Sequence, residues 1–169
     1  MFKTEPMFGH TIQPLTAMTL KFFELFNLVL SALVGGMYWG PWLALSRSLN
    51  TFEPGVFLAI THRLNQNMAG LMTFLTPLGL LSTLPTLYLS FDSQPTTFWL
   101  TLAGFGCFLT ALIVTVRIEV PIVMQIVSWD PSALPTHWAQ LRDRWVNFHR
   151  IRVAGGLIGL TLLAAGAIF

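Results

Sequence analysis

Residues 98–116 read FWLTLAGFGCFLTALIVTV, a run of 19 residues without one charged side chain. An apolar helix of about 20 residues is long enough to cross the hydrocarbon core of a bilayer. Residues 25–45, 68–89 and 153–169 have the same character. The sequence therefore predicts an all-helical fold, a bundle of four transmembrane helices that forms one domain over residues 1–169.

The composition agrees with lipid as the solvent of this bundle. Hydrophobic residues make up 54% of the chain and charged residues only 9%, against roughly 25% charged residues in soluble domains. The net charge of +2 is small and no run of Lys or Arg occurs, which argues against nucleic acid as a partner. We expect the bilayer as the main partner, and the sequence leaves a homo-oligomer or a larger membrane complex open.

Several local patterns predict where the helices begin, end and approach one another. Apolar residues recur at helical spacing over residues 57–64, which indicates a short amphipathic surface helix in the first loop. Pro121 is expected to interrupt the third helix. Thr136 is placed to cap a last helix that extends beyond the membrane and runs to the last residue of the sequence. The first span also offers small residues for close helix packing, namely Gly35, Gly36 and Gly40.

Most basic residues lie on one side of the predicted bundle. The first loop and the third loop, with its flanking helix ends, hold seven arginines, whereas the opposite face holds Lys3 and Lys21. By the positive-inside rule we expect the first and third loops in the cytoplasm and both termini on the other side of an inner or plasma membrane. The seven are Arg47, Arg63, Arg117, Arg142, Arg144, Arg150 and Arg152.

A stripe of aromatic and ionisable side chains marks the last helix. Trp138, Arg142, Trp145, His149 and Arg152 are separated by four, three, four and three residues, so they share one face of a helix. A buried arginine or histidine needs a partner. The stripe therefore implies something acidic, anionic or metallic opposite it.

Glu119 is the expected partner, because it ends the preceding helix on the same side of the membrane. One interpretation is purely structural, a salt bridge that holds the third and fourth helices together. The other is a functional site, because ionisable residues at membrane depth mark such sites by default. Both interpretations stay open at this point.

Histidines raise the question of a metal. His62 on the predicted loop helix lies on the same side as His149 and Glu119, and two histidines with a carboxylate suit non-haem iron, while two histidines suit haem. The spacing supports neither, because no two histidines stand four residues apart. We expect no cofactor, with haem or iron held by His62 and His149 as the alternative.

Four segments of the sequence resemble the anthrone oxygenase-like family of small integral membrane proteins with four spans. They are residues 117–129 (RIEVPIVMQIVSW), 134–138 (LPTHW), 141–145 (LRDRW) and 148–152 (FHRIR). The sequence HRLN at residues 62–65 also looks like the first loop of the family. Family members usually carry Asn just after the Val-Pro-Ile element, where this chain has Val123 and Met124.

The resemblance implies a membrane site for a small aromatic or quinone-like molecule, and oxygenation of an anthrone to an anthraquinone without metal or flavin. We expect His149 to act as the base, and Arg142 and Arg152 to stabilise the resulting anion. Glu119 would orient these side chains or balance their charge. The residues expected to contact the substrate are Trp138, Trp145, His62 and Asn65.

Two other functions stay open. A non-catalytic accessory subunit would use its Gly-rich helices and exposed aromatic residues to contact partner subunits or pigments, and would co-purify with them. A haem or iron protein would be coloured and would contain metal when purified. Transport is less favoured, because the sequence offers few polar residues midway across the bilayer.

Overall fold

The computed structural model describes residues 9–169, and all regular structure in this part of the chain is helical. The helices form four columns, three of which consist of consecutive elements. In chain order the elements are α1 (Gly9–Pro41), the π-helical turn η1 (Trp42–Ser46), the 3-10 turn η2 (Leu49–Thr51), α2 (Pro54–Leu81), α3 (Thr83–Ser90), α4 (Pro95–Val114), the π-helical turn η3 (Thr115–Glu119), α5 (Val120–Val127) and α6 (Trp138–Ile168).

Each column is long and apolar enough to cross a membrane, over residues 16–51, 54–90, 95–127 and 138–168. Large apolar side chains cover the outside of the bundle, where lipid is their natural solvent. Phe74, for example, is 76% exposed. The chain is therefore an integral membrane protein with the four-helix architecture that the sequence predicts.

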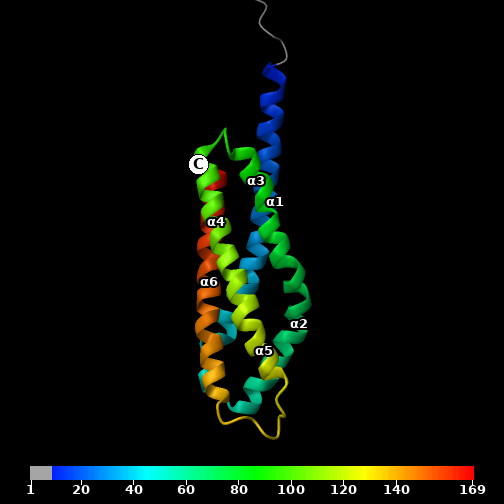
Figure 1. Ribbon diagram of the computed structural model, residues 1–169, viewed down its shortest axis with the longest axis vertical. Helices are drawn as coiled ribbons and strands as arrows, with labels where there is room; N and C mark the ends of the chain where they lie inside the picture. Colours follow the sequence, from blue (N-terminus) through cyan, green and yellow to red (C-terminus); the bar gives the residue numbers. More distant parts are fainter. Residues whose placement is uncertain (1–8) are drawn as a thin grey trace, which may run out of the picture.

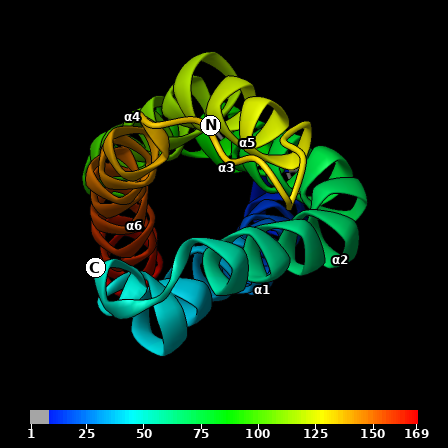
Figure 2. The same ribbon diagram turned by 90° about the horizontal axis from the view of Figure 1, so that it is seen from below.

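Figures 1 and 2 show how the columns surround the bundle axis. α6 lies between α1 and α4, and α2 lies between α1 and α5. The turn between α3 and α4 and the end of α6 are at the top of Figure 1, whereas α5 and the loop to α6 are at the bottom. The bundle thus has two ends, and the predicted stripe of α6 lies at the lower one.

Glycines let α6 approach α4 closely. A Cβ atom at Gly159 would lie 2.8 Å from Cδ2 of Phe108, closer than real Cβ contacts. The prediction of close packing at the first-span glycines is wrong for Gly36 and Gly40, where an added Cβ would meet nothing within 4 Å. The reason is their direction, because both are exposed on the outer face of α1.

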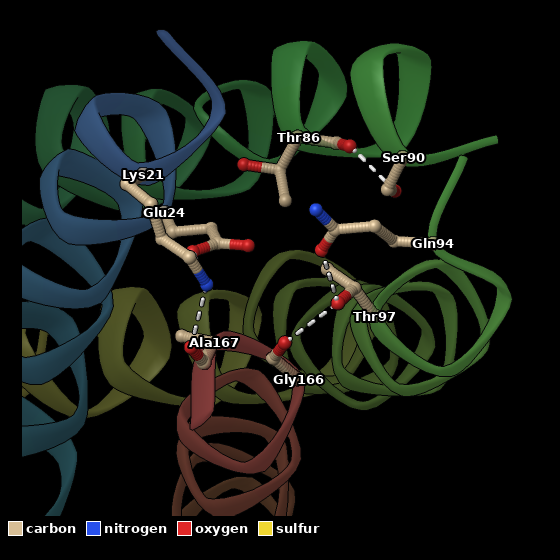
Figure 3. A network of polar contacts seen from close by, with 8 residues as sticks. All are labelled: Lys21, Glu24, Thr86, Ser90, Gln94, Thr97, Gly166 and Ala167. Carbon is tan, nitrogen blue, oxygen red and sulfur yellow. Dashed lines mark hydrogen bonds and ion pairs between the residues drawn. The ribbon is translucent and has the colours of Figure 1, made fainter. Parts of the chain in front are cut away.

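A polar network holds the C-terminal end of α6 at the upper end of the bundle (Figure 3). Lys21 of α1 donates a hydrogen bond to the carbonyl oxygen of Ala167 at 2.9 Å and pairs with Glu24 at 2.9 Å. Thr97 of α4 donates to the carbonyl oxygen of Gly166 at 2.9 Å. The last carbonyls of a helix lack partners within the helix, and a cation beside them is favourable. The network therefore fixes α6 to its two neighbours.

Two boundaries inside the columns differ from the predictions. Residues 57–64 do not form a separate surface helix, because α2 begins at Pro54 and passes through them into the second span. The predicted interruption of the third column lies just before Pro121 rather than at it, where α4 gives way to the turn η3, and the column continues to Val127. The π-helical turn η3 comes just before Pro121, and its wider turn makes room for the proline ring in the first turn of α5.

The last helix begins near Thr136, as predicted, but Thr136 does not cap it. Trp138 is its first residue and His137 is its N-cap, without a side-chain capping hydrogen bond. Thr136 instead lies in a turn closed by the hydrogen bond from Trp138 N to Pro135 O, at 3.1 Å.

Candidate functional site

A cavity of about 450 Å³ lies among α2, the segment from η3 to α5, and α6. These elements meet in the lower half of the bundle in Figure 1. Aliphatic side chains and the methionines Met68, Met72 and Met124 form most of its wall. The hydrogen-bonding and charged residues in the lining are Thr61, Asn65, Thr73, Thr76, Thr115, Glu119, Trp145, His149 and Arg152.

Glu119 faces the cavity because the helix widens just before it. Buried positions of α4 recur every three or four residues up to Val114, and the next buried residue is Glu119, five positions further on. In a regular α-helix Ile118 would come close to this place. The π-helical turn η3 adds the extra residue, and such turns are frequent at functional sites.

Glu119, His149 and Arg152 form one buried polar group. Arg152 makes an ion pair with Glu119, and its Nη2 donates a hydrogen bond to His149 Nδ1 at 2.8 Å. His149 Nδ1 also lies 3.4 Å from Glu119 Oε1. Glu119 is 2% exposed and His149 is 0% exposed. The predicted pairing of Glu119 with an arginine of the stripe is thus confirmed for Arg152.

Aromatic rings fix this group on two sides. The indole of Trp145 stacks on the imidazole of His149, with ring centroids 4.8 Å apart and an angle of 9° between the planes. From α1, the ring of Tyr38 lies 4.8 Å from Cζ of Arg152. Trp145 and His149 meet because residues four apart are neighbours on a helix surface. The charged group is therefore held between flat walls from two columns.

Some buried polar atoms of this region have no hydrogen-bond partner among the described residues. They include His149 Nε2 and Arg152 Nε, which make no hydrogen bond, and Glu119 Oε1, which has the 3.4 Å contact with His149 Nδ1 but no hydrogen bond. A buried polar atom without a partner costs about 1–3 kcal/mol. Since Arg152 donates to Nδ1, a neutral His149 carries its proton on Nε2. The site thus offers one free acceptor oxygen on Glu119 and free donors on its neighbours.

The structure divides the predicted site residues into two groups. Asn65 lines the cavity, together with three residues of the stripe, Trp145, His149 and Arg152. His62, Trp138 and Arg142 do not line it. Arg142 instead lies over the Trp138 ring, with Cζ 4.9 Å from its centroid, and donates from Nε to the carboxylate of Asp143 at 2.9 Å. Below Trp145 an apolar cluster fills the space that the stripe would otherwise face. It contains Leu49, Phe57, Leu58, Ile122 and Ile126.

Sequence reasoning missed Tyr38, Thr76 and Thr115 as neighbours of the site. A signal existed for Tyr38, because the buried polar residues of α1 share one helical face. Val123 and Met124, where the family usually carries Asn, both line the cavity. Within residues 9–169 no three His, Cys, Asp or Glu side chains are grouped as metal ligands would be. The residues of the α1 face are Glu24, Asn27, Ser31 and Tyr38.

The comparison with known protein families gives a match. The sequence model of the family described as anthrone oxygenase matches residues 65–162, which is more than half of the chain. No curated protein and no solved structure matches the sequence. The matched segment begins at Asn65 and contains Glu119, His149 and Arg152, whereas Tyr38 lies before it.

Proposed function

The chain belongs to the anthrone oxygenase family, and we propose that its cavity binds a small, lipid-soluble aromatic molecule and oxidises it with O2. The observation that carries this proposal is the group of Glu119, His149 and Arg152 at the wall of an otherwise apolar cavity, with buried polar atoms left free for a ligand. A cavity of about 450 Å³ is within the size range of small-molecule sites. Apolar walls with a few convergent polar groups are typical of such sites.

The outer side of the cavity supports a ligand that arrives from the bilayer. Val116, Val120 and Met124 line the cavity, yet they are 55%, 47% and 57% exposed. Their exposed surface belongs to a membrane-spanning column, so lipid lies next to them. A molecule dissolved in the bilayer would reach the cavity between α2 and the η3–α5 segment.

In the proposed reaction, a methylene group activated by neighbouring aromatic rings becomes a carbonyl. A base first removes one proton, and the resulting carbanion, delocalised as a phenolate, transfers electrons to O2 and forms a carbon–oxygen bond. The base returns this proton to the outer oxygen of the peroxide. The C–H bond that remains and the O–O bond then break, so that the second methylene hydrogen also leaves as a proton and the outer oxygen departs with both hydrogens as water. One oxygen atom enters the carbonyl and the other enters water, so the four electrons balance without another oxidant.

The geometry favours Glu119 over His149, the base expected from the sequence. Arg152 occupies the Nδ1 lone pair of His149 at 2.8 Å, whereas Glu119 Oε1 has only the longer contact of 3.4 Å with the same nitrogen. Arg152 Nε and His149 Nε2 are then the donors that would stabilise the developing oxyanion. Trp145 contributes a flat apolar wall beside them.

Anthrone and O2 test this proposal with the full chain in lipid nanodiscs. We expect oxygen uptake and anthraquinone formation above the rate of empty nanodiscs, and a rate lower by about 100-fold or more for Glu119→Gln, since general bases contribute at least that much. Asp92→Asn, an exposed carboxylate in the turn after α3, is the matched control and should leave the rate unchanged. Turnover equal to that of empty nanodiscs, or unaffected by Glu119→Gln, would contradict the proposal.

A visible spectrum of the same preparation tests the alternative of a haem protein. The proposed oxygenase needs no pigment, so we expect no Soret band. A Soret band that His149→Ala abolishes would overturn the proposed mechanism. A stable complex with stoichiometric partner proteins, combined with no binding of anthrone, would favour the accessory subunit instead.

A further inference from the structure

A second pocket lies on another face of α6, at the lower end of the bundle. Its volume is about 290 Å³, and it is formed where the first half of α6 meets the residues that follow α1. Along α6 its residues are spaced three, one and three apart, which defines one helical face. That face is next to the one that carries Trp145 and His149. The lining residues are Ser46, Arg47, Asn50, Asp143, Val146, Asn147 and Arg150.

The pocket carries an uncompensated positive charge. Arg47 and Arg150 form no ion pair within the described part of the chain, so they contribute two positive charges. Asp143 is the acid in the lining, but its carboxylate is already bound by Arg142, at 2.8 Å from Nη2 and 2.9 Å from Nε. The side-chain amides of Asn50 and Asn147 add neutral donors. The lining is therefore suited to an anion.

Aromatic residues place this pocket near the surface of the membrane. Cζ of Arg47 lies 5.6 Å from the ring centroid of Trp42, and Trp42 stacks on Trp39 at 5.5 Å. Both tryptophans are at the lower end of the first span. Tryptophans concentrate at the depth of the lipid headgroups, and basic pockets between helices at that depth bind anionic headgroups.

We propose that this pocket binds a phosphate group, with Arg47 and Arg150 as its charged ligands. Arginine pairs with phosphate through two parallel hydrogen bonds, and two arginines from different columns can contact one phosphate from opposite sides. The phosphate belongs either to an anionic phospholipid or to a small anion from water. Binding would join the end of α1 to α6 beside the proposed oxidation site, and it does not depend on that function.

Native mass spectrometry of the purified full chain tests the pocket. The protein in detergent is incubated with phosphatidylglycerol, with phosphatidylcholine, or with phosphatidylglycerol plus inorganic phosphate. The test variant is Arg47→Gln with Arg150→Gln. The control is Arg63→Gln with Arg144→Gln, which removes the same charge from exposed arginines outside the pocket. Thermal unfolding of both variants verifies that they fold.

We expect the wild type to retain phosphatidylglycerol in preference to phosphatidylcholine. Each pocket arginine that is replaced should lower the affinity for phosphatidylglycerol roughly fivefold, because a basic residue near a membrane surface strengthens the binding of anionic lipid by about this factor. Retention that inorganic phosphate does not displace identifies the lipid headgroup as the source, and displacement identifies the free anion. Equal losses for the test and control variants, or equal retention of the two lipids by the wild type, would overturn the proposal.

Discussion

Arg152 of α6 lies with Cζ 4.8 Å from the ring centroid of Tyr38 of α1, while its guanidinium also pairs with Glu119 of η3. One side chain thus connects three of the four columns. An arginine over an aromatic face is attracted by the ring, more strongly where water is excluded. Among the acids of residues 9–169, Glu119 alone forms an ion pair with Arg152, so we expect the stability of the bundle to depend on that carboxylate.

Replacing Glu119 with Ala should lower the free energy of unfolding by about 3–5 kcal/mol, because the change leaves a buried guanidinium without its counter-ion. The measurement is unfolding in detergent, followed by the intrinsic fluorescence of tryptophan. Asp92→Ala removes an exposed carboxylate and should change the stability little. A small effect of Glu119→Ala, similar to that of Asp92→Ala, would show that Arg152 finds water or another partner.

The double variant Glu119→Leu with Arg152→Met separates the structural interpretation of this ion pair from the functional one. Apolar replacement of both partners is often neutral or stabilising for a buried ion pair, so we expect stability close to that of the wild type. If the site is functional, anthrone oxidation is lost all the same. Wild-type turnover by this stable double variant would show that the ion pair is only a structural salt bridge between columns.

The sequence predicts the four spans because long runs without charge have few alternatives to crossing a bilayer. It also predicts the partner of Arg152, since Glu119 is the acid nearest to the membrane at the same end of the bundle. These predictions rest on composition and on which end of a helix a residue occupies. Both properties survive small errors in helix boundaries.

The details of the site depend on departures from a regular helix, and periodicity cannot reveal those. The π-helical turn η3 brings Glu119 rather than Ile118 to the inner face. The local sequence contains no signal that predicts such a turn. The stripe of α6 was expected to face a single site, but packing around Phe57 separates Trp138 and Arg142 from the cavity. Which residues fill a space is a tertiary property, so one helix alone does not determine it.

Met124→Trp should obstruct the side of the cavity that faces lipid. Met124 lines the cavity and is 57% exposed, so a larger ring there would cover the opening between α2 and α5. We expect anthrone to bind at least about tenfold more slowly, an increase of roughly 1.4 kcal/mol in the barrier. Stopped-flow fluorescence in nanodiscs measures the rate. Ile113→Trp is the control, because Ile113 is 53% exposed but does not line the cavity. Equal slowing of anthrone binding by both variants would contradict a route through this opening.

Val123→Asn tests the position at which this chain departs from its family. Val123 lines the cavity, so an amide there would offer a hydrogen bond to a phenol or carbonyl. One added hydrogen bond contributes about 1 kcal/mol, which corresponds to roughly fivefold tighter binding of anthrone by equilibrium titration. Val127→Asn lies outside the lining and serves as the control. Unchanged or weaker binding by Val123→Asn alone would show that the ligand does not approach this wall.

Gly159→Ala should destabilise the contact between α6 and α4. The added methyl would lie 2.8 Å from Cδ2 of Phe108 and 3.2 Å from Cβ of Cys107, so the ring and the helix must shift. Overpacking of this kind costs about 1–3 kcal/mol. Gly106→Ala is the matched control, because its added Cβ would meet nothing within 4 Å and the exchange favours the helix by roughly 0.5–1 kcal/mol. The Tm measured in detergent should therefore fall for Gly159→Ala and rise for Gly106→Ala. A shift of both Tm values in the same direction would mean that α4 and α6 are not as close as the glycine contact requires.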